Sequence, residues 1–322
     1  MTGSQEALDI TLTQFKPDAV AQLLSLWQQV MPRDAPDGER FRDIVLLDSQ
    51  FRPEGLAMLF RGERLIGFSY AVAANAPAGA RPRGWIVGLG VAPGQRRAGH
   101  GTRLLQSSLR FLASAGCSEA RLGGNGERYL LPGADPAEYP EFHQFIQAAG
   151  FRAAGHTEAL ARDLRGVPLD DAADSHPGQP YVYRHPEEGD IPELLRVAGE
   201  FGPGWAGLVR SHLSRGGSPT HLWIACGPDG IAGFAGSDLF PGCVGRFGPT
   251  GVLPAARGHG VGGRLLRLSL ASMAARGRPT AWFLWGPEGA SGRRMYESAG
   301  FYVNRRFDFF THDLTERELD GN

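Results

Sequence analysis

The alternation of apolar and polar residues predicts the same series of strands in both halves of the chain. Runs with a period of two, and short apolar runs bounded by turn residues, are typical of strands. In the first half such runs cover residues 8–13, 56–60, 65–73, 85–91, 120–122 and 157–164, and in the second half 181–184, 222–226, 231–237, 244–252, 281–285 and 302–314. Each half contains one hairpin followed by a strand that leads into a glycine-rich loop.

Apolar residues spaced three and four apart predict helices between these strands. In the first half they cover 17–30, 40–47, 100–115 and 141–149, and in the second half one helix starts at 189–192, one follows residue 262 and one contains Tyr296. A segment with little apolar content, 166–180, separates the two series. We therefore expect domains at 1–165 and 181–322 joined by this linker, which suits a chain of 322 residues.

One strand–loop–helix unit occurs twice with the same residue spacing. The first copy reads Val91-Ala-Pro-Gly-Gln-Arg96-Arg97-Ala98-Gly99-His100-Gly101-Thr102-Arg-Leu-Leu, and the second reads Val252-Leu-Pro-Ala-Ala-Arg257-Gly258-His259-Gly260-Val261-Gly262-Gly263-Arg-Leu-Leu. Glycine allows positive φ and a close approach of a ligand. The first N–H groups of a helix have no partner inside it, and they attract phosphate. Two copies in one context indicate an internal duplication and predict a phosphate site in each half.

The Arg-x-x-Gly-x-Gly loop between a strand and a helix resembles the GNAT family of N-acetyltransferases, once per half and over nearly the whole chain. The pattern is most similar to tandem GNAT proteins of the general mycothiol-synthase type, although it does not fix that substrate. The resemblance implies an α/β fold with two tandem domains, each a mixed, mostly antiparallel twisted sheet flanked by helices. It also implies acetyl transfer from acetyl-CoA to a primary amine of a small molecule or peptide.

The same resemblance assigns the cofactor-binding residues, with the pyrophosphate of acetyl-CoA on the two loops. They are Val91, Arg96, Arg97, Ala98, Gly99, His100, Gly101 and Thr102 in the first half, and Val252, Arg257, Gly258, His259, Gly260, Val261, Gly262 and Gly263 in the second. A backbone N–H at Val91 or Val252 is expected to stabilise the oxyanion.

The catalytic acid is expected in the second half. A thiol has a pKa of about 8.5, so a positioned acid helps the thiolate to leave. In the family this acid is commonly a tyrosine four residues before the glycine of a Gly-Phe pair, and Tyr296 has that spacing before Gly300. The first half has Ile146 at this place, and isoleucine cannot donate a proton. Tyr129 or Tyr139 is an alternative acid for the first half.

The first half is also longer beside its site. From Arg96 to Phe151 is 55 positions, whereas from Arg257 to Phe301 is 44, a difference of eleven. The extra residues fall mostly within 126–139, where we expect a surface excursion. A loop of this size beside a site is often functional, and a neutral insertion is the alternative.

Other polar residues have weaker signals. Asp238 and Glu288 follow strands of the second half and are candidate bases, although a solvated surface position explains each of them as well. His100 and His259 are taken to share one place in the two loops, beside phosphate or solvent. Trp205 follows the first helix of the second half and is a candidate for the acceptor site.

Composition narrows the partners. The 33 basic and 34 acidic residues give a net charge of −1, so no nucleic acid partner is expected. Lys16 is the only lysine, which is typical of a GC-rich bacterial genome. No apolar run reaches membrane-spanning length and no signal peptide is read, so we expect no membrane partner and a cytoplasmic location.

Further expectations concern metal binding, the oligomeric state and the alternatives to an enzyme. Cys117, Cys226 and Cys243 lack metal-ligand spacing, so no metal is expected. A homodimer is left open. The alternatives to an enzyme are a non-catalytic regulatory protein that binds acyl-CoA, and an interaction scaffold that binds no CoA.

Overall fold

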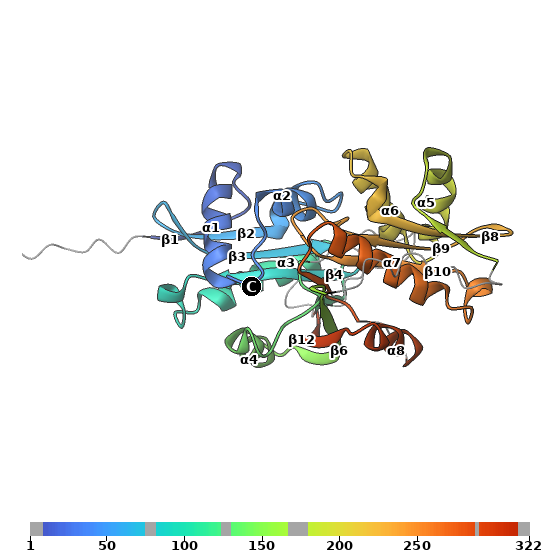
Figure 1. Cartoon of the computed structure of the whole chain (residues 1–322). Coiled ribbons are helices and arrows are strands. Elements are labelled where there is room, and N and C mark those ends of the chain that lie inside the picture. Colours follow the sequence, from blue (N-terminus) through green and yellow to red (C-terminus); the bar gives the residue numbers. More distant parts are fainter. Residues whose placement is uncertain (1–8, 75–81, 124–129, 167–179, 287–289, 315–322) are drawn as a thin grey trace, which may run out of the picture. The chain divides into compact units, whose positions relative to one another are not determined.

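The computed structural model describes residues 9–74, 82–123, 130–166, 180–286 and 290–314. The chain divides into two compact units, and most of their elements are labelled in Figure 1. Unit 1 comprises Met1–Thr157 with Phe307–Asn322, and unit 2 comprises Glu158–Arg306. Each unit thus combines residues from both sides of the linker expected at 166–180, which differs from the domain boundaries drawn from the sequence.

Unit 1 contains a mixed sheet with the strand order β1-β2-β3-β4-β5-β12-β6. Its strands are β1 (Ile10–Thr13), β2 (Leu56–Arg61), β3 (Arg64–Ala73), β4 (Gly84–Val91), β5 (Glu119–Leu122), the second part of β12 (Tyr302–Asp313) and the first part of β6 (Arg152–Asp163), and its helices are α1 (Val20–Val30), α2 (Gly38–Phe41), α3 (His100–Ser114) and α4 (Pro140–Ala148). β1, β2, β3 and β4 pair in this order, each antiparallel to the next. β5 is parallel to β4 and antiparallel to β12.

Unit 2 repeats this arrangement. Its strands are β7 (Val182–Arg184), β8 (Leu222–Gly227), β9 (Gly230–Ser237), β10 (Phe247–Val252), β11 (Thr280–Phe283), the second part of β6 and the first part of β12. Its helices are α5 (Ile191–Gly199), α6 (Pro203–Ser214), α7 (Val261–Ala275) and α8 (Ala290–Ser298). β7 to β10 form an antiparallel sheet. β11 pairs with β6 in antiparallel register, and a parallel bridge joins Trp282 to Arg246 just before β10.

The final strands of the two halves are exchanged. β12 lies late in the sequence, yet its Phe310 pairs with Leu122 of β5 in unit 1. β6 lies early in the sequence, yet its Asp163 pairs with Thr280 of β11 in unit 2. Each parallel strand pair is therefore flanked by a strand from the opposite half of the sequence.

Each unit buries apolar side chains on both faces of its sheet. In unit 1, α1 and α2 cover one face through Trp27 and Phe41, and α3 and α4 cover the other through Leu105 and Ile146. In unit 2, α5 and α6 cover one face, and α7 and α8 cover the other. The helix that follows each glycine-rich loop therefore packs on the same sheet face as the helix that carries Ile146 or Tyr296.

Two helical segments differ from the sequence prediction. The helix expected over 40–47 is α2 followed by a π-helical turn, Arg42–Leu46. α6 was not predicted, because glycines at its start have a low helix propensity. Burial of Val209 in the core under α5 stabilises this helix despite its composition. None of the helices among the described residues combines the length and apolar content that a bilayer crossing requires.

Candidate active site

The two glycine-rich loops have the same backbone conformation. α3 begins directly after Gly99 and α7 directly after Gly260, and these glycines have left-handed φ values of 77° and 75°. Two residues earlier, Arg97 has φ 64° and Gly258 has φ 80°. The left-handed region is unfavourable for arginine, so its presence at Arg97 indicates that the surrounding loop imposes this shape.

The loops fit a phosphate group. A side chain built on Gly99 in unit 1 or on Gly258 in unit 2 would meet no atom within 4 Å, so each loop has an open side. The first helical hydrogen bonds are donated by the N–H groups of Arg103 and Arg264, both at 3.0 Å. The N–H groups in the turn before them have no helical partner, and they belong to His100, Gly101 and Thr102 in unit 1 and to Val261, Gly262 and Gly263 in unit 2.

The loop arginines brace the end of the preceding strand. Arg96 Nε donates to the carbonyl of Val91 and Arg257 Nε donates to the carbonyl of Val252, both at 3.1 Å. This contact closes each loop back on its strand. The oxyanion role expected for the N–H groups of the two valines stays a prediction.

The guanidinium groups of these arginines have different neighbours. Arg96 Nη1 also contacts Glu141 Oε2 at 2.9 Å. Glu141 lies five residues before Ile146, and the residue five before Tyr296 is Ser291. Arg257 forms no ion pair with any of the described residues, and this distinguishes it from Arg96.

The parallel strands of each unit stop pairing before the loop, and the stretch over which they are unpaired is called the gap below. The pairing of β4 with β5 ends at Ile86 and Leu122, although β4 continues to Val91. In unit 2 the parallel bridge between Arg246 and Trp282 comes just before β10, which continues to Val252. Among the described residues, the rest of the longer strand has no parallel partner.

Tyr296 lies at the closed end of the gap in unit 2. Its ring centroid is 4.8 Å from that of Phe283 on β11 and 6.1 Å from that of Phe247 on β10. The side chain is 7 % exposed, and burial raises the pKa of the phenol above its usual value. The phenol is protonated at neutral pH, as an unshifted tyrosine also is. Ile146 is fully buried at the corresponding place in unit 1.

The extra residues of unit 1 are not a surface excursion. Leu130 and Leu131 pack with the core under α1 and α2, and Ala134 pairs with Asp308 of β12. Asp135 is 2 % exposed, and its carboxylate accepts hydrogen bonds from two backbone N–H groups. The difference in length located the insertion but did not show that its leucines are buried and that its backbone pairs with β12. The part of the insertion before residue 130 lies outside the described residues.

Two residues considered as acids or bases have structural partners. Tyr139 donates its hydroxyl hydrogen to Asp34 at 2.5 Å. The side chain of Asp238 is only 6 % exposed and accepts from Arg278 Nε at 2.9 Å and from the N–H of Gly245 at 2.6 Å. Asp238 is therefore neither a solvated surface carboxylate nor a free base. Tyr129 and Glu288 lie outside the described residues.

The histidines and Trp205 also differ from expectation. His100 is the first residue of α3, whereas His259 lies just before Gly260, so the two do not occupy equivalent places. His259 Nδ1 lies 3.0 Å from the carbonyl oxygen of Arg257. Trp205 stacks on Phe201 at 5.4 Å and packs with the core under α5 and α6. Its assignment to an acceptor site stays a prediction.

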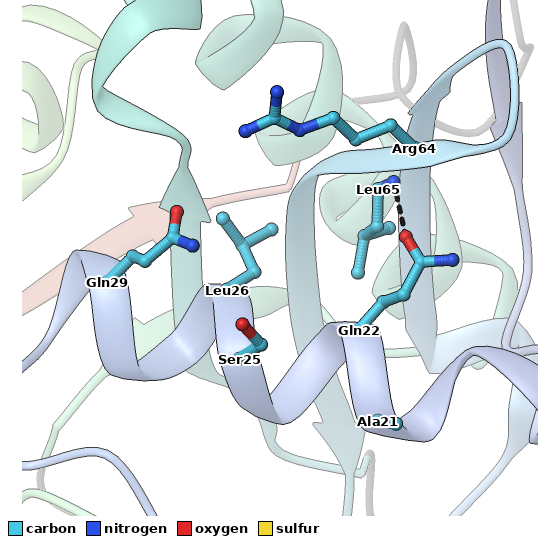
Figure 2. Close-up of a pocket in the computed structure, with 7 residues that line it drawn as sticks. All are labelled: Ala21, Gln22, Ser25, Leu26, Gln29, Arg64 and Leu65. Carbon is cyan, nitrogen blue, oxygen red and sulfur yellow. Dashed lines mark hydrogen bonds between the residues drawn. The ribbon is translucent and has the colours of Figure 1, made fainter.

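A separate pocket of about 320 Å³ lies between α1 and the start of β3, where Gln22 accepts a hydrogen bond from the N–H of Leu65 at 2.9 Å (Figure 2). Arg64 is the one charged residue that lines it, and no residue of the Gly99 loop does so. It is therefore distinct from the gap beside β4.

Sequence reasoning missed Glu141, Phe247 and Phe283. Aligning the two halves on their loop arginines would have paired Phe247 with Ile86 and Phe283 with Leu122. That comparison shows larger aromatic residues in the second half. The contact between Glu141 and Arg96 had no sequence signal, because 45 residues separate them.

Comparisons with known proteins agree with this architecture. A family model described as the Acetyltransferase (GNAT) family matches residues 20–125 and 193–301. No curated protein matches the chain by sequence. One similar structure is a GCN5-related glucosamine N-acetyltransferase region of a fungal multi-domain GH3 β-N-acetylglucosaminidase, with TM-score 0.73 and 15 % identity over 95 % of this chain. The match covers 38 % of that larger chain.

Two other structures match over nearly their whole length. A GCN5-related N-acetyltransferase from Sphaerobacter thermophilus has TM-score 0.65 and 16 % identity, covering 95 % of this chain and 96 % of that one. A tandem GNAT protein from the clavulanic acid biosynthesis pathway has TM-score 0.66 and 15 % identity, covering 95 % and 99 %. At such identities these structures establish the shared fold, while the family model matches most of the sequence. The chain belongs to the GNAT family of acetyltransferases, with two GNAT regions in tandem.

Proposed function

We propose that unit 2 transfers an acetyl group from acetyl-CoA to a primary amine of a small molecule or peptide. The observation that carries this proposal is the position of Tyr296, buried between Phe247 and Phe283 where the parallel strands separate. A tyrosine there can serve as the acid for the leaving sulfur. Family membership supports acetyl transfer as the type of reaction.

Different residues of unit 2 would bind the pyrophosphate, orient the thioester and donate the proton. The open N–H groups after Gly260 and the guanidinium of Arg257 would hold the pyrophosphate. Acetyl-CoA, when bound, supplies an activated thioester. The free edge of β10 would orient the arm that carries this thioester. Tyr296 would hold a proton at its phenolic oxygen until the thiolate departs, since a buried phenol remains neutral.

Unit 1 is proposed to bind the cofactor without catalysing transfer. It keeps the loop backbone but has Ile146 in place of the tyrosine, and Glu141 partly neutralises Arg96. Leu130 and Leu131 pack in the core on the sheet face opposite α4, whereas Ala134 packs in the core that contains Ile146. The amine must approach a bound thioester from the side that the cofactor leaves free. Residues 130–135 are proposed to block this approach in unit 1.

The first experiment tests the reaction type. The full chain is incubated with acetyl-CoA and a panel of amino sugars, polyamines and short peptides, and release of free thiol is measured. Acetylation of at least one amine, detected by mass spectrometry, is the expected result. Binding of CoA with no turnover on a broad panel would favour the regulatory alternative, and no binding would contradict both.

The second experiment tests the acid with Tyr296→Phe. This change keeps the ring and its packing, so the fold and the affinity for CoA should be unchanged. General acid catalysis is typically worth about 100-fold or more, so we expect kcat to fall at least tenfold. Tyr183→Phe, which removes a phenol elsewhere in unit 2, is the control and should retain activity. A wild-type kcat for Tyr296→Phe would assign the proton to another group.

A further inference from the structure

The closed end of the gap is filled differently in the two units. In unit 2 the residues just beyond the parallel bridge are Phe247 and Phe283, whose ring centroids are 6.2 Å apart. Both are buried. In unit 1 the pair at the same register is Ile86 and Leu122. The floor of the gap is therefore made of two aromatic rings in unit 2 and two aliphatic side chains in unit 1.

Two further aromatic rings, those of Tyr296 and Phe301, pack against Phe247 and Phe283 and restrict their movement. Phe301 lies 5.4 Å from Phe283 and 6.4 Å from Phe247, and Tyr296 contacts all three phenylalanines. Rings packed on several sides cannot turn away without disturbing their neighbours, because protein interiors are close-packed. A group that extends beyond the floor must therefore displace part of this cluster.

We infer that Phe247 and Phe283 form the floor of the acyl pocket of unit 2 and restrict the donor to acetyl and similarly short acyl groups. This inference rests on the proposed function. An arm anchored at the Gly260 loop starts at the carboxyl end of β10. If it follows the free strand edge, it runs back toward the point where β10 and β11 meet. Its far end, the acyl group, then points at the two phenylalanine rings.

The direct test measures binding without an amine. The full chain carries Gly99→Asp, so that unit 2 supplies the binding signal, and calorimetry compares acetyl-, propionyl-, butyryl- and hexanoyl-CoA. One methylene in an apolar pocket discriminates about 10- to 200-fold. We expect the affinity to fall at least tenfold from acetyl- to butyryl-CoA. In Phe247→Ile and Phe283→Leu, which introduce the residues of unit 1, this ratio should fall below threefold.

Controls separate the pocket from general damage. Ile86→Val alters the corresponding place in unit 1 and should leave the ratio unchanged. If Phe283→Leu does not fold, Phe247→Leu tests the same floor. Variants that fold but keep the wild-type ratio would overturn the inference, as would a wild-type chain that binds hexanoyl- and acetyl-CoA equally. A changed ratio without turnover of any amine would support the pocket and contradict the proposed function, and no binding of acetyl-CoA would overturn both.

Discussion

Replacing Gly260 by aspartate tests where the phosphate lies. At Gly99, the equivalent glycine of unit 1, no atom lies within 4 Å of the place that a Cβ would take, and aspartate is one of the few residues that adopt the left-handed conformation. The φ of 75° is left-handed, which costs a non-glycine residue about 1 kcal/mol. The substitution should therefore preserve the fold of unit 2 while placing a negative charge beside the start of α7.

The expected loss of affinity follows from Coulomb's law. Two like charges about 4 Å apart repel by about 1 kcal/mol in water and about 4 kcal/mol at the dielectric typical of a protein surface. The new carboxylate would also occupy the helix N-terminus that otherwise attracts the phosphate. Since about 1.4 kcal/mol is a factor of ten, we expect affinity for CoA at this site to fall at least tenfold.

Calorimetric titration with CoA is the assay. The wild type should bind two molecules per chain, and Gly260→Asp should lose the site in unit 2. Gly260→Asn has nearly the same shape and tolerates left-handed φ, so it separates charge from backbone strain. Gly99→Asp is the matched change in unit 1. If Gly260→Asp binds CoA as well as Gly260→Asn does, and both melt like the wild type, the phosphate does not lie at this loop.

Three more outcomes are expected. In the Gly260→Asp background, Glu141→Gln should strengthen CoA binding to unit 1 by about two- to fivefold, because Arg96 loses its exposed ion pair with Glu141. An unchanged affinity by calorimetry would show that Glu141 does not compete with CoA for Arg96. Ile146→Tyr in a Tyr296→Phe chain should not restore thiol release if residues 130–135 obstruct the acceptor as proposed. Recovered turnover would show that the acid alone was missing. Asp190 has a pKa lowered to about 2 by its hydrogen bond with Arg184, so its carboxylate stabilises the fold above pH ~4 and this contribution is lost as the pH falls toward 2. Asp190→Asn should therefore lower the free energy of unfolding by about 1 kcal/mol at pH 7, a value reduced for solvent screening because Arg184 is partly exposed. The urea midpoints of the wild type and of Asp190→Asn should converge as the pH falls below 3.

The loops could be predicted from the sequence because their determinants are local. Positive φ at Gly99 and Gly260, the start of a helix and the arginine that reaches back five residues all lie within one short segment. The order of strands and helices followed from periodicity for the same reason. α6 was missed because its stability depends on packing of Val209, which its own glycines do not reveal.

The strand exchange could not be predicted in the same way. β6 and β12 have equivalent places after α4 and α8, and both alternate well enough to pair with either β5 or β11. Periodicity specifies which residues of a strand face the core, but it does not choose between two similar partners. Expected boundaries at 165 and 181 therefore assigned Phe310 to the second half, although it pairs with Leu122 in unit 1.

The differences between the halves are concentrated after the shared loop. The strand, the brace from arginine to valine and the left-handed glycine are the same in both units. The residues that would act on a bound thioester differ, with Ile146 opposite Tyr296 and a buried insertion only in unit 1. If unit 1 were merely a scaffold, its packing would not require Arg97 to keep a left-handed conformation. A retained loop beside a residue other than tyrosine at position 146 supports the proposal that unit 1 binds the cofactor without catalysing the transfer.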